Sequence, residues 1–266
     1  MSDALEQALS PGSWPTLAFV LTRTGGFMVA APLWSISGIP RPVRAAVAAV
    51  LSVALLPAAQ RVVLPEALVA LPVGMTLEFV IGLAIGLAAA VIVYGMAMAG
   101  EVLAIQMGLS LGPAASPLAE LAVPGIGQMQ SFLAMLIYLS VGGHLMLLRG
   151  LSDSLTALPP GGAATLEAST EMVSGLLGTL FGCALRTAAP TMVALLLIHV
   201  AIAITGRAVP QIHAILLAFP VTIGVGLFVI GASLPVVGAA VTQWMADIPE
   251  RVALVIQSFQ PQPWGP

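Results

Sequence analysis

The feature that most constrains this chain is a run of 39 consecutive residues, 208–246, that contains no Asp, Glu, Lys or Arg. Three further uncharged runs lie upstream, at residues 79–100, 121–148 and 187–206. A water-soluble domain rarely leaves so many consecutive residues uncharged, whereas a segment buried in lipid or among neighbouring subunits must be so. The pattern predicts an integral-membrane or membrane-assembly protein.

Composition narrows the possible functions. Of the 266 residues, 59% are hydrophobic and only 7% are charged, which leaves little material for a solvated surface. All eight basic residues are arginine and the formal charge is −3, so the clustered cations that nucleic-acid binding requires are missing. Cys183 is the single cysteine, which excludes a disulfide framework or a thiolate metal site within the chain. We expect no metal and no cofactor.

Apolar runs of roughly 17–25 residues match the thickness of a bilayer's hydrocarbon core. The sequence predicts an all-α membrane protein with about six hydrophobic helices or helical hairpins, several of them broken by glycine or proline. The six runs lie near residues 14–35, 43–59, 76–111, 126–148, 172–205 and 211–238.

Glycine and proline mark the expected interruptions and contacts of these runs. We expect Gly95 and Gly100 to interrupt the third run and Pro190 to interrupt the fifth. Gly82 and Gly86 have the small-xxx-small spacing that lets two helix backbones approach closely. The third run is therefore expected to pack tightly against a neighbouring helix.

Charged residues inside apolar runs are the first candidates for function, because burying them in a membrane without a partner is costly. Four stand out: Arg23, Glu78, Glu101 and Arg186. In one interpretation the carboxylates relay protons in a proton-coupled transporter. In the other, which we favour, Glu78 or Glu101 neutralises an arginine at a contact between helices or subunits.

The most unusual segment is residues 100–131, which read GEVLAIQMGLSLGPAASPLAELAVPGIGQMQS. A helix is expected to end near Gly112, and a new one to begin after Pro124. Non-helical backbone beside apolar spans is tolerated only where protein or a water-filled cavity surrounds it, so a re-entrant or pore-lining loop is predicted. Ser110 also lies in a G-x-S-x-G pattern, but the strand that a nucleophile elbow needs is not expected before it. An intramembrane serine protease is therefore the weakest alternative.

Over most of its length the chain resembles the FliR family of flagellar type III export-gate membrane proteins. Each motif is weak alone, and their order and spacing carry the resemblance. The motifs are the Arg23 span ending in Ala31-Pro32, Ile39-Pro40-Arg41-Pro42-Val43-Arg44, Gly100-Glu101, Gln106-Met107-Gly108-Leu109-Ser110, Gly143-His144-Leu145, Leu158-Pro159-x-Gly161-Gly162, Arg207-Ala208-x-Pro210-Gln211 and Phe219-Pro220.

The resemblance implies a non-enzymatic subunit of the flagellar basal body in the bacterial inner membrane. Such a subunit assembles with FliP-like and FliQ-like proteins, with an FlhB-like protein alongside, and passes unfolded flagellar subunits. It implies one export-gate domain over residues 1–259, FliP-like in its N-terminal part and with a FliQ-like hairpin near 172–240. We expect the tail, 260–266, to be disordered. Use in an injectisome secretion system is the alternative within the same family, and a proton-coupled transporter is the alternative outside it.

The resemblance also assigns candidate site residues. The loop that closes the pore, with Met107 and Met129 as a possible apolar collar, is implied for Gly108, Leu109, Ser110, Leu111, Gly112, Pro113, Ser116, Pro117, Val123, Pro124 and Gly125. Buried charges or contacts with partner subunits are expected at Arg23, Arg41, Arg44, Glu78, Glu101, Arg186, Arg207, Pro210 and Gln211.

Overall fold

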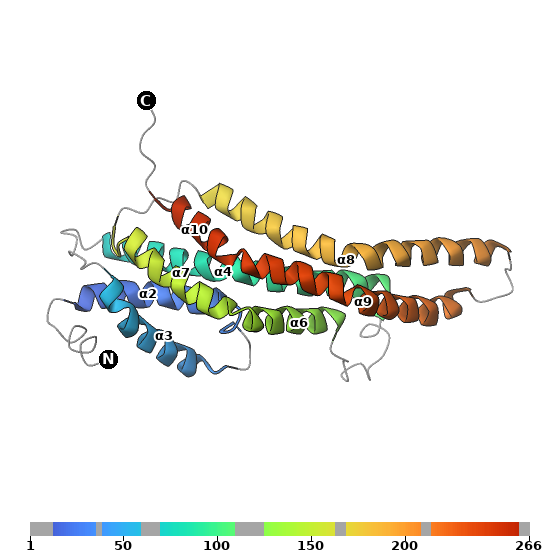
Figure 1. The fold of residues 1–266 in the computed structure, drawn as a ribbon, viewed down its shortest axis with the longest axis horizontal. Helices are drawn as coiled ribbons and strands as arrows, with labels where there is room; N and C mark the ends of the chain where they lie inside the picture. Colours follow the sequence, from blue (N-terminus) through green and yellow to red (C-terminus); the bar gives the residue numbers. More distant parts are fainter. Residues whose placement is uncertain are drawn as a thin grey trace, which may run out of the picture. The chain divides into compact units, whose positions relative to one another are not determined.

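The computed structural model describes residues 13–35, 39–59, 70–109, 125–162, 169–208 and 214–260. Within these residues the chain forms eight α-helices and one short 3-10 helix, and no strand occurs (Figure 1). The elements are α2 (Trp14–Ala30), α3 (Arg41–Leu55), η1 (Leu56–Ala58), α4 (Ala70–Gln106), α6 (Ile126–Ser140), α7 (Gly143–Ala157), α8 (Ser169–Ala208), α9 (Ala214–Ala246) and α10 (Ile248–Ser258). The all-α prediction is confirmed.

Among the described residues, four helical segments are long and apolar enough to cross a membrane: Arg41–Ala58, Leu71–Gln106, Met172–Arg207 and Pro220–Ala246. The bent pair α6 and α7 makes a fifth if it is counted as one span. In an apolar 18-residue stretch of the second segment 72% of the residues are buried within the chain, whereas in such stretches of the third and fourth segments only 22% and 11% are buried. Lipid or other proteins must therefore cover most of α8 and α9.

The expected interruptions of the third and fifth runs are wrong. Helix α4 continues through Gly95 and Gly100, and α8 continues through Pro190. The two glycines make room for neighbouring helices: a Cβ added at Gly95 would lie 2.8 Å from the carbonyl oxygen of Leu180, and one at Gly100 would collide with the backbone of Gly127. Pro190 removes one backbone hydrogen bond, which a long apolar helix packed in membrane or protein tolerates.

Two helix boundaries also differ from prediction. The run 126–148 is split into α6 and α7, which are bent by 66° at a break where Gly142 has a φ of 76°. Glycine reaches this left-handed region without steric cost, so the turn forms there. Helix α4 ends at Gln106 rather than near Gly112, because Gly108 with a φ of 78° terminates it. Helix α10 was not predicted as a hydrophobic run.

The described chain divides into two compact units. The first comprises residues 1–91, 138–177 and 245–266. In it α2 packs beside α3, and α10 packs on α7, where Val252 lies against Gly150. Helix α10 presents a buried apolar face of Ile248, Val252, Val255 and Ile256. Helix α10 therefore packs against α7 through apolar contacts.

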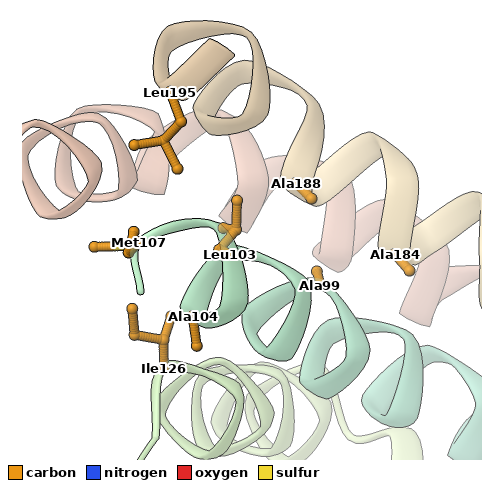
Figure 2. Close-up of a cluster of buried hydrophobic side chains, with 8 residues drawn as sticks. All are labelled: Ala99, Leu103, Ala104, Met107, Ile126, Ala184, Ala188 and Leu195. Atoms are coloured by element: carbon orange, nitrogen blue, oxygen red, sulfur yellow. The ribbon is translucent and has the colours of Figure 1, made fainter. Parts of the chain in front are cut away.

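The second unit comprises residues 92–137 and 178–244. Its core is a cluster of small and medium apolar side chains between α4, α6 and α8, drawn in Figure 2. The cluster contains Ala99, Leu103, Ala104, Met107, Ile126, Ala184, Ala188 and Leu195. Four of the eight are alanine, which lets the helix backbones approach closely.

Candidate functional site

The most elaborate polar site among the described residues surrounds Arg23, which lies on α2 in the first unit and is only 1% exposed. Its Nε donates a hydrogen bond to Oε2 of Glu78 on α4, at 2.6 Å. This charge-assisted bond neutralises the guanidinium inside the protein. The Nε side of the Arg23 guanidinium is thus held by α4.

The rest of the guanidinium is held by the C-terminal end of α7. One terminal nitrogen of Arg23 donates to the carbonyl oxygen of Ser154 at 2.8 Å and to its hydroxyl at 3.2 Å. The other donates to the carbonyl oxygen of Leu158 at 2.9 Å. The last carbonyls of a helix carry the negative end of its dipole, so a cation is favoured there. Helix α7 thereby supplies a second source of negative potential.

Glu78 is 4% exposed, and both of its carboxylate oxygens are used. Oε2 accepts from Arg23, and Oε1 accepts from the backbone N–H of Gly161 at 3.0 Å. Gly161 has a φ of 73°, a conformation that glycine adopts most readily. The turn after α7 is therefore tied to α4 through this carboxylate.

Glycines let α2 and α4 approach closely enough for this pairing. A Cβ added at Gly82 would collide with the backbone of Arg23, and one at Gly26 would collide with the carbonyl of Phe79. A Cβ at Gly86 would lie 2.8 Å from the Cβ of Ala30. The close helix contact predicted from Gly82 and Gly86 is confirmed.

We call Arg23, Glu78, Ser154, Leu158 and Gly161 the arginine network. It joins α2, α4 and α7 through five hydrogen bonds. The side chains of Arg23, Glu78 and Ser154 are buried, whereas Gly161 is exposed. Removing one partner of such a pair costs about 3–5 kcal/mol, because the other charge stays buried alone. The arginine network therefore fixes the positions of the three helices relative to one another. A proton relay through Glu78 would have to break its hydrogen bonds.

The other candidate charges lie in different surroundings. Arg41, Glu101, Arg186 and Arg207 are exposed, and Arg44 is half-buried. Oε1 of Glu101 lies 2.6 Å from where a Cβ on Gly127 would stand, so this carboxylate borders the first turn of α6. Of the predicted charges, Arg23 and Glu78 are brought together in a buried ion pair.

The two ends of the predicted pore loop are held next to each other in the second unit. Gly100 on α4 faces Gly127 on α6, and a Cβ at Gly127 would lie 2.8 Å from the carbonyl oxygen of Ala97. Gly108 ends α4, and Gly125 accepts hydrogen bonds from the backbone N–H groups of Gln128 and Met129 as α6 begins. Met107 and Ile126 on either side of the segment also belong to one buried cluster, so its flanking residues lie close together.

The two methionines proposed as a collar lie in different environments. Met107 is fully buried, and its Sδ lies 2.8 Å from where a Cβ on Gly226 of α9 would stand. Met129 is 62% exposed on α6. Leu109, also a predicted loop residue, is 42% exposed.

Several predicted site residues fall outside the described residues. These are Ser110, Leu111, Gly112, Pro113, Ser116, Pro117, Val123, Pro124, Pro210 and Gln211. Among the described residues no group of three or more His, Cys, Asp or Glu side chains is placed to hold a metal ion.

Sequence reasoning missed the part that α7 takes in the arginine network. Ser154 is fully buried and was not singled out, and the Leu158 carbonyl and Gly161 N–H are backbone groups. A signal was available. Pro159 follows the end of α7 and Gly161-Gly162 follows Pro159, a composition typical of a helix stop that leaves carbonyls free for a cation.

The chain matches a protein-family model over residues 14–248, and that family is described as "Bacterial export proteins, family 1". The matched region includes the whole second unit, most of the first unit and the whole arginine network.

Curated relatives agree over long stretches. The chain is 28% identical over 250 residues to "Flagellar biosynthetic protein FliR" of Escherichia coli (strain K12), covering 93% of this chain and 95% of the relative. It is 27% identical over 226 residues to the protein of the same name in Bacillus subtilis (strain 168), covering 82% and 85%. It is 25% identical over 189 residues to that of Aquifex aeolicus (strain VF5), covering 69% and 70%.

Proposed function

The chain belongs to the bacterial export proteins, family 1, and we propose that it is a subunit of the flagellar type III protein export gate. The observation that carries this proposal is the family match over residues 14–248, with relatives named flagellar biosynthetic proteins aligned along nearly the whole chain. Such a subunit is required to export rod, hook and filament proteins. The role is transport and assembly rather than enzymatic catalysis.

The long apolar helices support membrane insertion with several passes, and we place the protein in the inner membrane at the flagellar basal body. The sparse burial of α8 and α9 supports partners at these helices. We propose FliP-like and FliQ-like gate subunits and an FlhB-like protein as those partners. In this proposal residues 1–259 act as one export-gate domain, and residues near 172–240 form its FliQ-like hairpin.

Deletion of the gene in its own bacterium tests the function. We expect loss of filaments and of hook protein from the medium, with both restored by a plasmid copy. Retained filaments would favour the proton-coupled transporter. Retained motility with loss of an injectisome's secreted proteins would favour the injectisome alternative. The sealed position of Glu78, with both oxygens bonded, speaks against a relay role for that carboxylate.

We further propose that residues 108–125 close the export channel. Support comes from the anchored ends of this segment, the Gly100–Gly127 contact and the turn at Gly108. Deleting residues 114–119 should leave the gate assembled but make the membrane leaky to small ions. Conductance of the deletion strain equal to that of the wild type would refute the closing role.

A collar of Met107 and Met129 around that channel remains a prediction. Met107 would have to leave its contact with Gly226 to line a pore. Cross-linking cysteines introduced at these two positions to an arrested substrate tests this: both should react, and a reaction at position 129 alone would exclude Met107.

Arg207, exposed at the end of α8, is proposed to contact a partner subunit together with Pro210-Gln211. Arg207→Ala should lower the recovery of co-purified FliP-like protein. Arg149→Ala, at an exposed arginine on α7, is the matched control and should not. Equal recovery from both variants would assign Arg207 no partner role.

A further inference from the structure

We propose that the cavity beside Arg186, between α8 and α9 of the second unit, binds the phosphate group of a membrane phospholipid. The cavity has a volume of about 500 Å³. It is lined by Arg186, Thr187 and Pro190 of α8 and by Ser233, Val236, Val237, Ala240, Gln243 and Trp244 of α9. Pockets of this size hold small-molecule ligands.

Arg186 has a charge that needs an anion. It is exposed, and within the part of the chain that the structure describes it forms no hydrogen bond or ion pair. A guanidinium facing hydrocarbon without a partner costs roughly 2.5–3.5 kcal/mol. The arginine must therefore meet an anion or lie at the level of the lipid headgroups, and a lipid phosphate satisfies both conditions.

The spacing of the charges on α8 is consistent with Arg186 at the level of the lipid headgroups. Residues 187–206 between Arg186 and Arg207 are uncharged. At 1.5 Å per residue these 20 residues span about 30 Å, the thickness of the hydrocarbon core. The whole of α8, with 40 residues, is about twice as long as the hydrocarbon core is thick. Placing residues 187–206 in the hydrocarbon puts an arginine at each boundary and none at the centre.

The lining of the cavity fits the same boundary. Trp244 is half-buried on α9, and tryptophan is enriched where headgroups meet hydrocarbon. Its indole N–H is a donor, and Gln243 offers an amide. Pro190 has no backbone N–H, so the Arg186 carbonyl lacks its helical donor and can accept from a glycerol or headgroup hydroxyl.

The apolar lining favours a lipid over a free anion or a partner's acidic side chain. Pro190, Val236, Val237 and Ala240 offer surface to the glycerol and upper acyl chain. Inorganic phosphate would leave these residues uncovered. A single carboxylate side chain would leave most of the cavity empty. Basic pockets between membrane helices are a recognised setting for anionic headgroups.

Native mass spectrometry of the full-length chain in detergent, titrated with phosphatidylglycerol, tests the proposal. Arg186→Gln should weaken retention of the first lipid about fivefold, the effect of one arginine near an anionic surface. Arg186→Lys should keep most of the binding, since the charge remains. Arg149→Gln, an exposed arginine on α7, is the matched control and should bind like the wild type.

Three outcomes of that titration would overturn the proposal. One is unchanged lipid retention in Arg186→Gln. Another is displacement of the lipid by inorganic phosphate, which would assign a site for a soluble anion. The third, seen when the Arg186→Gln chain is also purified with its gate partners, is unchanged lipid retention together with loss of a co-purified subunit, which would assign the contact to an acidic side chain of that partner.

A second measurement keeps the test independent of the arginine variants. With Trp14, Trp34 and Trp264 replaced by Phe, the fluorescence of Trp244 reports its depth in vesicles of brominated phosphatidylglycerol. Bromine near the glycerol should quench Trp244 more strongly than bromine at the chain end. Stronger quenching from the chain end would place the cavity in the hydrocarbon and contradict the headgroup assignment. Neither measurement tests the export function, so failure of the lipid proposal would not contradict the proposed function.

Discussion

Arg23 and Arg186 look alike in the sequence, since each lies inside a long apolar run, yet the structure places them in opposite surroundings. Arg23 is 1% exposed and is surrounded by a carboxylate and the end of a helix, all supplied by the chain itself. Arg186 is exposed and has no such partner among the described residues. An arginine in an apolar helix can therefore be paired within its own chain or be exposed for a contact with another molecule. Only the three-dimensional contacts distinguish the two cases.

The largest expected effect comes from breaking the ion pair of Arg23 and Glu78. Glu78→Ala should lower the free energy of unfolding by about 3–5 kcal/mol, because the guanidinium stays buried without its carboxylate. The double variant Arg23→Met/Glu78→Leu should recover most of that loss. Thermal unfolding of the detergent-solubilised chain measures both. A double variant as unstable as the sum of the singles would show that the charges are not coupled.

The next effect concerns the glycines that let α2 reach α4. Gly26→Ala should lower stability by about 1–3 kcal/mol, since its Cβ would overlap the carbonyl of Phe79. Gly25 is the matched control on the same helix, because an added Cβ there meets no described atom within 4 Å. Gly25→Ala should be neutral or stabilising by up to about 1 kcal/mol. Equal unfolding temperatures for the two variants would contradict the close contact.

A smaller effect is expected at the turn that serves Glu78. Gly161 has a φ of 73°, so Gly161→Ala should cost about 1–2 kcal/mol in the left-handed conformation. Gly161→Asn should cost less, because asparagine tolerates that region. Chemical denaturation of the three proteins ranks them. If Ala and Asn proved equally harmful, lost space rather than backbone conformation would be responsible.

The smallest effect is expected at Arg186. Arg186→Gln should change the unfolding free energy of the isolated chain by less than about 0.5 kcal/mol, as for other exposed positions without partners. Comparison with Glu78→Ala under the same conditions completes the contrast. A loss of several kcal/mol at Arg186 would mean that this arginine, too, is fastened within the chain.

The apolar runs predicted the helices well, because hydrophobic length is a local property of the sequence. Contacts were harder to predict. Gly95 and Gly100 were predicted to interrupt a helix. The sequence alone does not distinguish a glycine that weakens a helix from one that lets a neighbouring helix pack closely. The bend at Gly142 was missed for the converse reason, although the Gly142-Gly143 pair marks the place. Arg23 pairs with Glu78 across a separation of 55 positions in the chain, and a local sequence pattern does not record so distant a contact.

The contact between Gly100 and Gly127 has a consequence for how this protein can vary. This contact holds the two ends of the intervening segment together. Packing outside the segment therefore offsets the entropy that is lost when the loop is closed. Loop-closure entropy rises only about 0.6 kcal/mol for each doubling of length. A change in the number of residues between the tied ends should therefore cost little stability in the helices on either side.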